Sequence, residues 1–254
     1  MRPLILISND DGVEAPGIHY LAQWVKELGD VYIIAPSVPQ SGKSASMTFN
    51  EPLRITQHED FEGCKVFSID GTPVDCVKLG LHKVVPRKPD LLLSGINHGS
   101  NAACNCIYSG TMGAVFEGSM AGIPSIGFSL MHHAMEADFS ECERFVKQIS
   151  SDVLAKGLPH DIALNVNFPA GVKLQGLKVV RAARSHWTED YKEYLDPSGK
   201  PFYWLSGTQI NEEPDNPETD LYWIDRNYAT AVPVAAEQSV PSAISAINEM
   251  LSDC

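Results

Sequence analysis

The chain has 254 residues and a formal net charge of -13 at neutral pH, with 32 acidic residues against 19 lysines and arginines. This length is enough for one large α/β domain with a substantial core. The acidic balance argues against a protein that binds nucleic-acid polymers or anionic membranes, since such proteins need clustered basic side chains. A substrate that carries phosphate must therefore be bound by a local arrangement of residues.

The sequence also indicates where the protein works. No stretch approaches the roughly 20 apolar residues of a membrane-spanning helix, and we expect no signal peptide at the N-terminus. The six cysteines include no zinc-type pair, so we expect a reduced, cytoplasmic protein. Cys104 and Cys106 are interpreted as small loop residues, because paired zinc ligands are normally two or more positions apart.

The first forty residues have the pattern of a strand, a helix and a second strand. Residues 4–7 form an apolar run that is typical of a strand buried on both faces. Apolar residues then recur at helical spacing from Ile18 to Leu28, before Gly29 and a second apolar run at residues 31–35. We therefore predict a βαβ unit.

Further elements follow in the same alternation. Residues 44–69 have short alternating stretches, which predict antiparallel strands or an excursion from the main sheet. Thr72 and Pro73 are typical of a helix N-cap and first helical position. Later elements are expected as strands at 90–94, 124–130 and 162–166 and as helices at 111–121 and 136–156. Because strands alternate with helices, we predict an α/β fold with a Rossmann-like, doubly wound, mostly parallel sheet.

Residues 186–228 differ, because they hold nine of the 21 aromatic residues among several turn-forming segments. This is too aromatic for a disordered linker. Two interpretations stay open: a β-hairpin arm packed on its own domain, or a subunit interface, where Trp and Tyr are enriched. We divide the chain into a catalytic core (1–185), a hairpin and oligomerisation arm (186–230), and a C-terminal strand and helix that return to the core (231–254), with the helix at 239–251.

Three predicted loops with oxygen ligands meet where the strands end, which is where open parallel sheets bind ligands. Two adjacent carboxylates both stay ionised most easily beside a cation, so Asp10 and Asp11 are candidate metal ligands. Ser41 and Asn97, after later strands, would complete a set of oxygen donors that suits Mg²⁺ or Mn²⁺ better than zinc. Alone, the turn Asn9-Asp10-Asp11-Gly12 would be read as the entry to a helix.

A possible phosphate site follows at Ser109-Gly110-Thr111, where a glycine-bearing loop turns into a helix. Exposed backbone amides at a helix N-terminus bind anions. A plain serine N-cap is the simpler alternative, but a metal site nearby would make the two together a site for phosphoryl transfer. His98 is a candidate for contact with substrate or for general acid help.

Other motifs are set aside. The segment Ser41-Gly42-Lys43-Ser44 resembles the end of a P-loop, but position 37 is Ser where that motif needs Gly. His132-His133 is interpreted as an exposed pair.

Together these motifs resemble the SurE family of stationary-phase survival proteins. The matching segments, in the order of the family, are Ile7 to Gly12, Ala35-Pro36 through Gln40-Ser41-Gly42, Gly71 to Val77, Ser94 to Asn101, and Tyr108 to Ala114. Weaker matches occur at Leu164 to Pro169 and at Phe202 to Leu205.

The resemblance implies a 5'/3'-nucleotidase that hydrolyses nucleoside monophosphates with one Mg²⁺ or Mn²⁺ per subunit, and that sometimes trims short polyphosphate. It implies metal ligands at Asp10, Asp11, Ser41 and Asn97. Substrate and phosphate contacts are expected at Asn9, Asn101 and Ser109-Gly110-Thr111. It also implies a homodimer or homotetramer built through exchanged C-terminal arms. One departure is residues 102–107, where the family usually has a carboxylate.

Two questions stay open at this point, and a third possibility is set aside. The catalytic role of Asp10 and Asp11 is to hold a metal ion that acidifies water, or Asp10 itself attacks phosphorus. The main alternative function is a non-catalytic nucleotide-binding regulatory module, against which the four oxygen ligands argue. A phosphatase of the aspartyl-phosphate type would instead need an Asp-x-Asp motif after the first strand.

Overall fold

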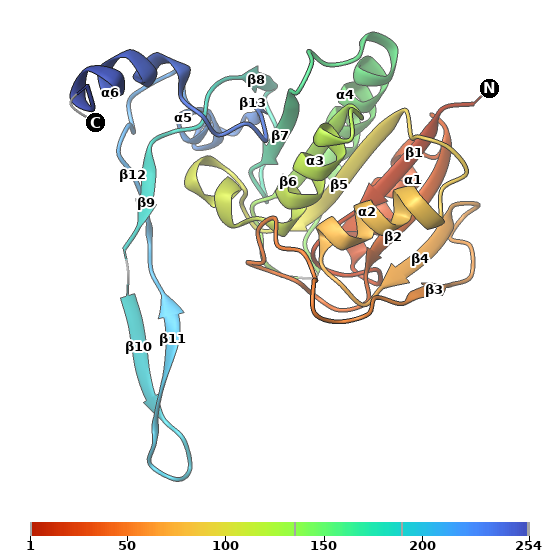
Figure 1. The fold of residues 1–254 in the computed structure, drawn as a ribbon, viewed down its shortest axis with the longest axis horizontal. Helices are drawn as coiled ribbons and strands as arrows, with labels where there is room; N and C mark the ends of the chain where they lie inside the picture. Colours follow the sequence, from red (N-terminus) through yellow and green to blue (C-terminus); the bar gives the residue numbers. More distant parts are fainter. Residues whose placement is uncertain (1, 135, 189, 253–254) are drawn as a thin grey trace.

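The computed structural model describes residues 2–134, 136–188 and 190–252. Within these residues the centre of the fold is a nine-stranded sheet in the order β3-β4-β2-β1-β5-β6-β7-β13-β8 (Figure 1). From β4 to β7 all neighbours are parallel, which confirms the predicted α/β, mostly parallel fold. The strands are β1 (Leu4–Ser8), β2 (Asp30–Pro36), β3 (Ile55–Gln57), β4 (Lys65–Ile69), β5 (Leu91–His98), β6 (Ser125–Leu130), β7 (Ala163–Phe168), β8 (Leu177–Val179) and β13 (Ala229–Val234).

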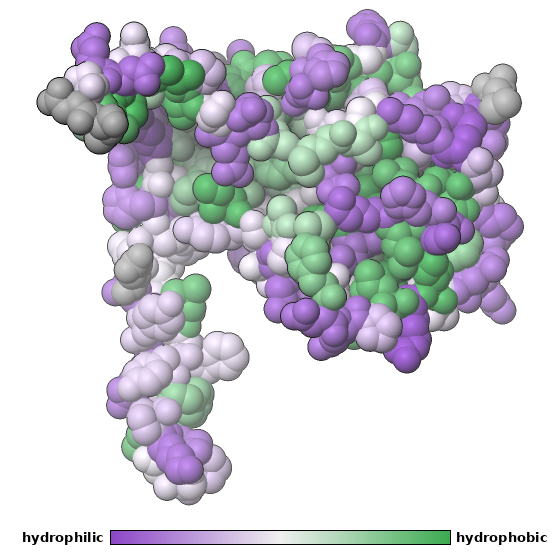
Figure 2. All heavy atoms as spheres, viewed as in Figure 1, coloured by the Kyte–Doolittle hydropathy of each residue, from purple (hydrophilic) through white to green (hydrophobic). Residues whose placement is uncertain are grey.

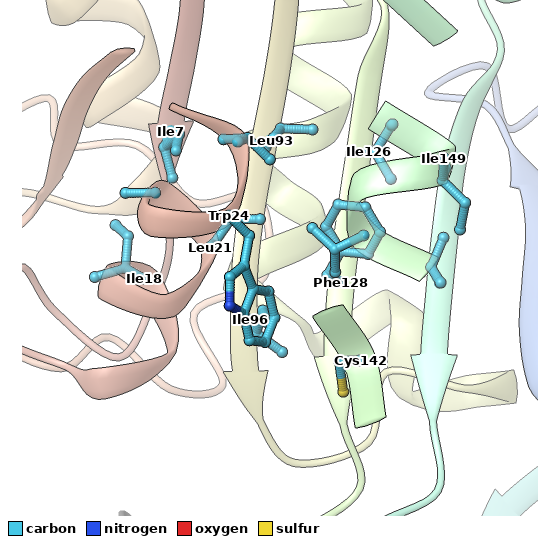
Figure 3. Packing of buried hydrophobic residues seen from close by; sticks show 14 of the residues in the cluster. Ile7, Ile18, Leu21, Trp24, Leu93, Ile96, Ile126, Phe128, Cys142 and Ile149 are labelled. Carbon is cyan, nitrogen blue, oxygen red and sulfur yellow. The ribbon is translucent and has the colours of Figure 1, made fainter. Parts of the chain in front are cut away.

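Helices cover both faces of this sheet. Because side chains alternate along a strand, Ile5 and Ile7 of β1 belong to one core cluster and Leu6 to the other. Helices α1 (Pro16–Val25) and α4 (Glu143–Lys156) cover the first face, while α2 (Pro73–Lys83) and α3 (Gly110–Met120) cover the second. Figure 3 shows Leu21 and Trp24 of α1 over β5 in the first cluster.

The start of α2 has the predicted cap. Thr72 accepts a hydrogen bond from the N–H of Asp75, and Asp75 accepts one from the N–H of Thr72, which makes a capping box. Asp75 also accepts hydrogen bonds from the backbone and hydroxyl of Thr48, at 3.1 and 2.6 Å. The cap therefore ties the loop after β2 to α2.

Three features of the fold differ from the prediction. β3 and β4 are antiparallel, as expected, but β4 lies beside β2 in the main sheet, so the interpretation as an excursion is wrong. β5 continues to His98 across a register shift, so Asn97 lies on the strand rather than in a loop. α4 begins at Glu143 rather than 136, because Asp138 accepts the N–H of Ser140 and starts a short 3-10 turn first.

A long β-hairpin projects from the body of the molecule (Figures 1 and 2). Its root pairs β9 (Ser185–Trp187) with β12 (Gln209–Asn211), and its outer part pairs β10 (Asp190–Leu195) with β11 (Pro201–Ser206). The aromatic side chains of the outer part are at least 42% exposed. They therefore do not pack on their own domain, and that interpretation is wrong for this part of the arm.

The chain then returns to the sheet. A short helix, α5 (Asp220–Ile224), precedes β13, which pairs antiparallel with β7. The last helix, α6 (Ile244–Met250), has no buried residue, so the predicted return of this helix to the core is not observed. In the ranges given above, no helix combines the length and apolar character that crossing a bilayer requires.

Candidate active site

The loop after β1 is held by Asn9. Its side chain is fully buried, and its amide binds both the carbonyl and the N–H of Gly12, at 2.9 and 3.2 Å. Gly12 has φ +101°, which only glycine adopts easily. Both polar groups of Asn9 thus hold the turn that presents Asp10 and Asp11, and a substrate contact by Asn9 stays a prediction.

Asp10 joins three segments of the chain. Its side chain is 4% exposed and accepts a hydrogen bond from the hydroxyl of Thr111 on α3. Its carbonyl accepts the N–H of Gln40 at 2.7 Å, which brings the exposed Ser41 to the same edge of the sheet. Gly110 is pressed against it: a Cβ on that residue would lie 2.8 Å from the Asp10 Cβ. The start of α3 therefore has space only for glycine here.

Burial makes both carboxyls hold protons more tightly, and at Asp10 the charge of its neighbour adds to the effect. Burial, and next the charge of Asp11, raises the pKa of Asp10 to about 6, although the Thr111 hydrogen bond opposes the shift. Burial also raises the pKa of Asp11, and the hydrogen bond from the N–H of His98 opposes it. A cation between these two carboxylates would relieve both effects.

Asn97 reaches this site from β5. Asp11 accepts the N–H of the next residue, His98, at 3.0 Å. The side-chain nitrogen of Asn97 donates to the carbonyl of Gly99 at 3.0 Å and lies 3.4 Å from Oδ1 of Asn101. This fixes the amide, and its carbonyl oxygen accepts no hydrogen bond from the described residues. That oxygen is available to a ligand.

Asn101 is buried in a network that sequence reasoning missed. Its side chain donates to Ser129 at 2.7 Å, its backbone N–H donates to Asn167, and its carbonyl accepts from Asn165. Both parts of its amide are therefore used to hold Asn97 and the loop, and its predicted substrate contact stays a prediction. The available signal was Asn165-x-Asn167, two polar residues on one face of an otherwise apolar strand.

The first turn of α3 faces the carboxylates. Ser109 is the N-cap, and its hydroxyl accepts the N–H of Met112 at 3.0 Å. The plain N-cap reading is thus correct for the Ser109 hydroxyl. The unpaired amides of a helix N-terminus still carry partial positive charge. The three residues Ser109-Gly110-Thr111 lie beside Asp10, in a position to bind an anion there.

The two histidine segments lie next to Asp11. His98 is 8% exposed, and its Nδ1 lies 3.1 Å from the carbonyl of Ala134, to which it donates. Its buried Nε2 has no hydrogen-bond partner among the described residues. Its ring packs edge-on against Phe139 at 5.1 Å, and its role toward substrate stays a prediction. His133 is exposed, as expected of that pair, yet it lies against Gly99 and its charge lowers the pKa of Asp11.

The donors at this edge fit a hard divalent cation. They are two carboxylates, a serine hydroxyl and an amide oxygen, which is the chemistry that Mg²⁺ and Mn²⁺ prefer. In the part of the chain that the structure covers, no group of three or more His, Cys, Asp or Glu side chains could hold a metal ion.

Known proteins are similar to this chain in sequence and in fold. The family model described as Survival protein SurE matches residues 5–189. Proteins named 5'-nucleotidase SurE include one from Christiangramia forsetii, 44% identical over 92% of this chain and 91% of its own length. Another, from Phocaeicola vulgatus, is 43% identical over 91% and 90%. The crystal structure of the SurE protein from Aquifex aeolicus is 35% identical, covers 98% of this chain and 99% of its own, and has a TM-score of 0.83.

Proposed function

Because the chain belongs to the SurE family, we propose that it is a nucleotidase that hydrolyses nucleoside 5'- and 3'-monophosphates with one bound divalent metal ion. Relatives that match almost their full length bear the name 5'-nucleotidase SurE, which supports the activity and the 5'-monophosphate substrate. The hydrogen bond from Thr111 to Asp10 is the observation that carries the metal and phosphate assignment, because it joins the two parts of the site.

In this proposal Asp10, Asp11, Ser41 and Asn97 hold Mg²⁺ or Mn²⁺. When bound, such an ion neutralises phosphate charge and makes water a better nucleophile. Asp10 is oriented by the Thr111 hydroxyl, and Asp11 by the N–H of His98. Each carboxylate is thus oriented by a donor of the protein, and the two would bind the cation together.

The N-terminus of α3 supplies the phosphate site. Backbone amides at Gly110 and Thr111 stabilise the negative charge that grows on the phosphoryl oxygens, because they are already oriented before the reaction. These amides would give a phosphate group the local positive charge that a chain of net charge -13 does not provide elsewhere. Asn9 and Asn101 hold the two loops around the phosphate, with His98 next to them.

The test is phosphate release from a panel of 5'- and 3'-nucleoside monophosphates and short polyphosphate, each with Mn²⁺, Mg²⁺ or EDTA. We expect turnover with metal and none in EDTA. Asp11→Asn is expected to lower turnover at least about 100-fold, while Asp138→Asn, an exposed carboxyl beyond β6, serves as the matched control. Activity that survives both EDTA and Asp11→Asn would contradict the metal assignment.

A different outcome would identify a regulatory module. If the protein binds nucleoside monophosphates by calorimetry but releases no phosphate with either metal, the non-catalytic alternative is correct. Rapid acid quench during a single turnover, followed by mass analysis of the peptide that contains Asp10, tests whether its carboxylate attacks phosphorus. A phosphoryl group on that peptide would show direct attack.

We also propose that the protein is a homodimer or homotetramer that assembles through the β10–β11 hairpin. The support is an exposed set of large apolar and aromatic side chains on a projecting element: Tyr191, Tyr194, Leu195, Phe202, Tyr203, Trp204 and Leu205. A cytoplasmic location is supported by the five described cysteines, which are all free thiols.

A further inference from the structure

Asp220 is a buried carboxylate outside the residues proposed to bind metal and phosphate. It is the first residue of α5 and is 0% exposed. Its Oδ2 accepts the backbone N–H of Ala103 at 2.8 Å, and its Oδ1 accepts those of Ala183 and Leu221, also at 2.8 Å. One carboxylate therefore joins the segment before α3, the root of the arm and α5.

Asp220 meets a hydrogen-bonding need beside an apolar cluster. The residues whose N–H groups it accepts, Ala103, Ala183 and Leu221, belong to this cluster together with Ala102 and Ile224. Burial raises the pKa of Asp220, and its hydrogen bonds oppose the shift. A side chain without acceptors would leave three buried N–H groups unpaired, so the carboxylate fixes the backbone of all three segments.

The bond to Ala103 meets a rare backbone conformation. Ala103 has φ +54°, in the left-handed region that residues with a Cβ seldom adopt. Such a conformation persists only where the surroundings hold it. Two residues before it is Asn101, which contacts Asn97, and after it the 3-10 turn η1 (Ala103–Tyr108) leads directly to Ser109.

Contacts from the arm root secure the same turn. The hydroxyl of Ser185 accepts the N–H of Cys104 at 3.2 Å, and the indole of Trp187 donates to Asn105 at 2.7 Å. These bonds are more exposed than the one to Asp220. Asp220 is thus the buried anchor of the segment.

We propose that Asp220 is a positioning residue for the nucleotidase reaction. Through its hydrogen bond to Ala103 it fixes residues 101–109, so that Asn101 and Ser109 keep their places on either side of the phosphate site. This inference rests on the proposed function, because that function assigns this segment to the substrate.

The substitution Asp220→Asn is designed to remove the hydrogen bond from Ala103 while it keeps those from Ala183 and Leu221. An asparagine has one acceptor oxygen, and the orientation that keeps the bonds from Ala183 and Leu221 turns its NH₂ group toward the N–H of Ala103. We expect KM for a nucleoside 5'-monophosphate to rise about tenfold. A general loss of folding would instead lower kcat and leave KM as it was.

A second substitution provides the rescue. Glycine adopts positive φ without strain, so combining Asp220→Asn with Ala103→Gly is expected to bring KM most of the way back to the wild-type value. Amide hydrogen exchange of the full-length protein with Mn²⁺ gives a readout that needs no turnover. Asp220→Asn should speed exchange in residues 103–109 about tenfold or more, with α1 and β1 unchanged, and the double variant should slow it again.

The outcomes separate the two proposals. If the wild type hydrolyses no nucleoside monophosphate but the exchange pattern appears and is rescued, the proposed function fails while Asp220 still fixes the segment. Unchanged KM together with unchanged exchange in Asp220→Asn would overturn the positioning role. So would a fall in kcat at unchanged KM that Ala103→Gly does not reverse.

Discussion

The hydroxyl of Thr111 donates a hydrogen bond to Asp10, and this bond spans 101 positions of sequence to join the first turn of α3 to the loop after β1. It connects the side chain proposed to hold the metal with the helix end proposed to hold phosphate. The two halves of the site therefore move together.

Thr111→Val tests this connection, because valine keeps the shape of threonine and removes the donor. The Thr111 bond lowers the pKa of Asp10, so its loss should raise that pKa further and weaken metal binding near pH 6. We expect turnover to fall roughly 10- to 100-fold, measured as phosphate release against Mn²⁺ concentration. Thr111→Ser retains the hydroxyl and should stay within a few-fold of wild type; an equal loss in both variants would contradict the role of the bond.

Asp10→Asn should stabilise the metal-free protein. The folded-state pKa of Asp10 is raised from 3.8 to about 6, so between these values the native state binds more protons than the unfolded state. Stability from this group is therefore lost as the pH rises through that window. Above it the loss is roughly 3 kcal/mol, which asparagine avoids.

The measurement is urea unfolding in EDTA at about pH 4 and about pH 8. The variant should match wild type at the lower pH and exceed it at the higher. Added Mn²⁺ should stabilise wild type more than the variant, since binding to the native state adds stability. A variant that is less stable than wild type at about pH 8 in EDTA would show that Asp10 is not strained by its charge.

Gly110→Ala should displace the start of α3 from Asp10. The added Cβ would lie 2.8 Å from the Asp10 Cβ, which is closer than Cβ atoms approach. We expect a loss of stability of about 1–3 kcal/mol and a larger loss of turnover, read by thermal unfolding and phosphate release. Ser119→Ala, at the other end of the same helix, should leave turnover unchanged; normal activity in Gly110→Ala would mean that the contact is not needed.

Trp204→Lys with Leu205→Ser should weaken self-association. Both residues are exposed on the outer hairpin, at 65% and 72%, and neither belongs to the core clusters. Sedimentation velocity should show a smaller assembly with unchanged thermal unfolding of the monomer body. Glu193→Gln on the same hairpin is the control, and an assembly that both variants leave intact would place the interface elsewhere.

Much of the fold could be predicted because the central strands β1 and β2 are apolar runs of their own. Residues 4–7 and 31–35 needed no distant information, and Thr72-Pro73 is a local cap. The grouping of Asp10 and Ser41 also followed from a general rule, since parallel strands end at one edge of a sheet.

The rest depended on contacts that sequence order hides. Asp220 lies 117 positions from Ala103, and nothing in its own neighbourhood marks it as buried. Asn165 and Asn167 acquire a role only once β7 is known to lie beside β6. The sequence also could not show whether the hairpin packs on its own domain or projects from it, because aromatic residues are common both in a core and in an interface.

The projecting hairpin also affects how this protein can vary. Its turn at residues 196–200 is closed by Asp196, which accepts hydrogen bonds from the N–H groups of Ser198 and Lys200. The turn lies far from the sheet edge proposed to bind metal and phosphate (Figure 1). This turn can be lengthened, or its residues exchanged, without a change in the packing of the body of the molecule. The tip is thus a natural point for inserting a tag or a foreign loop.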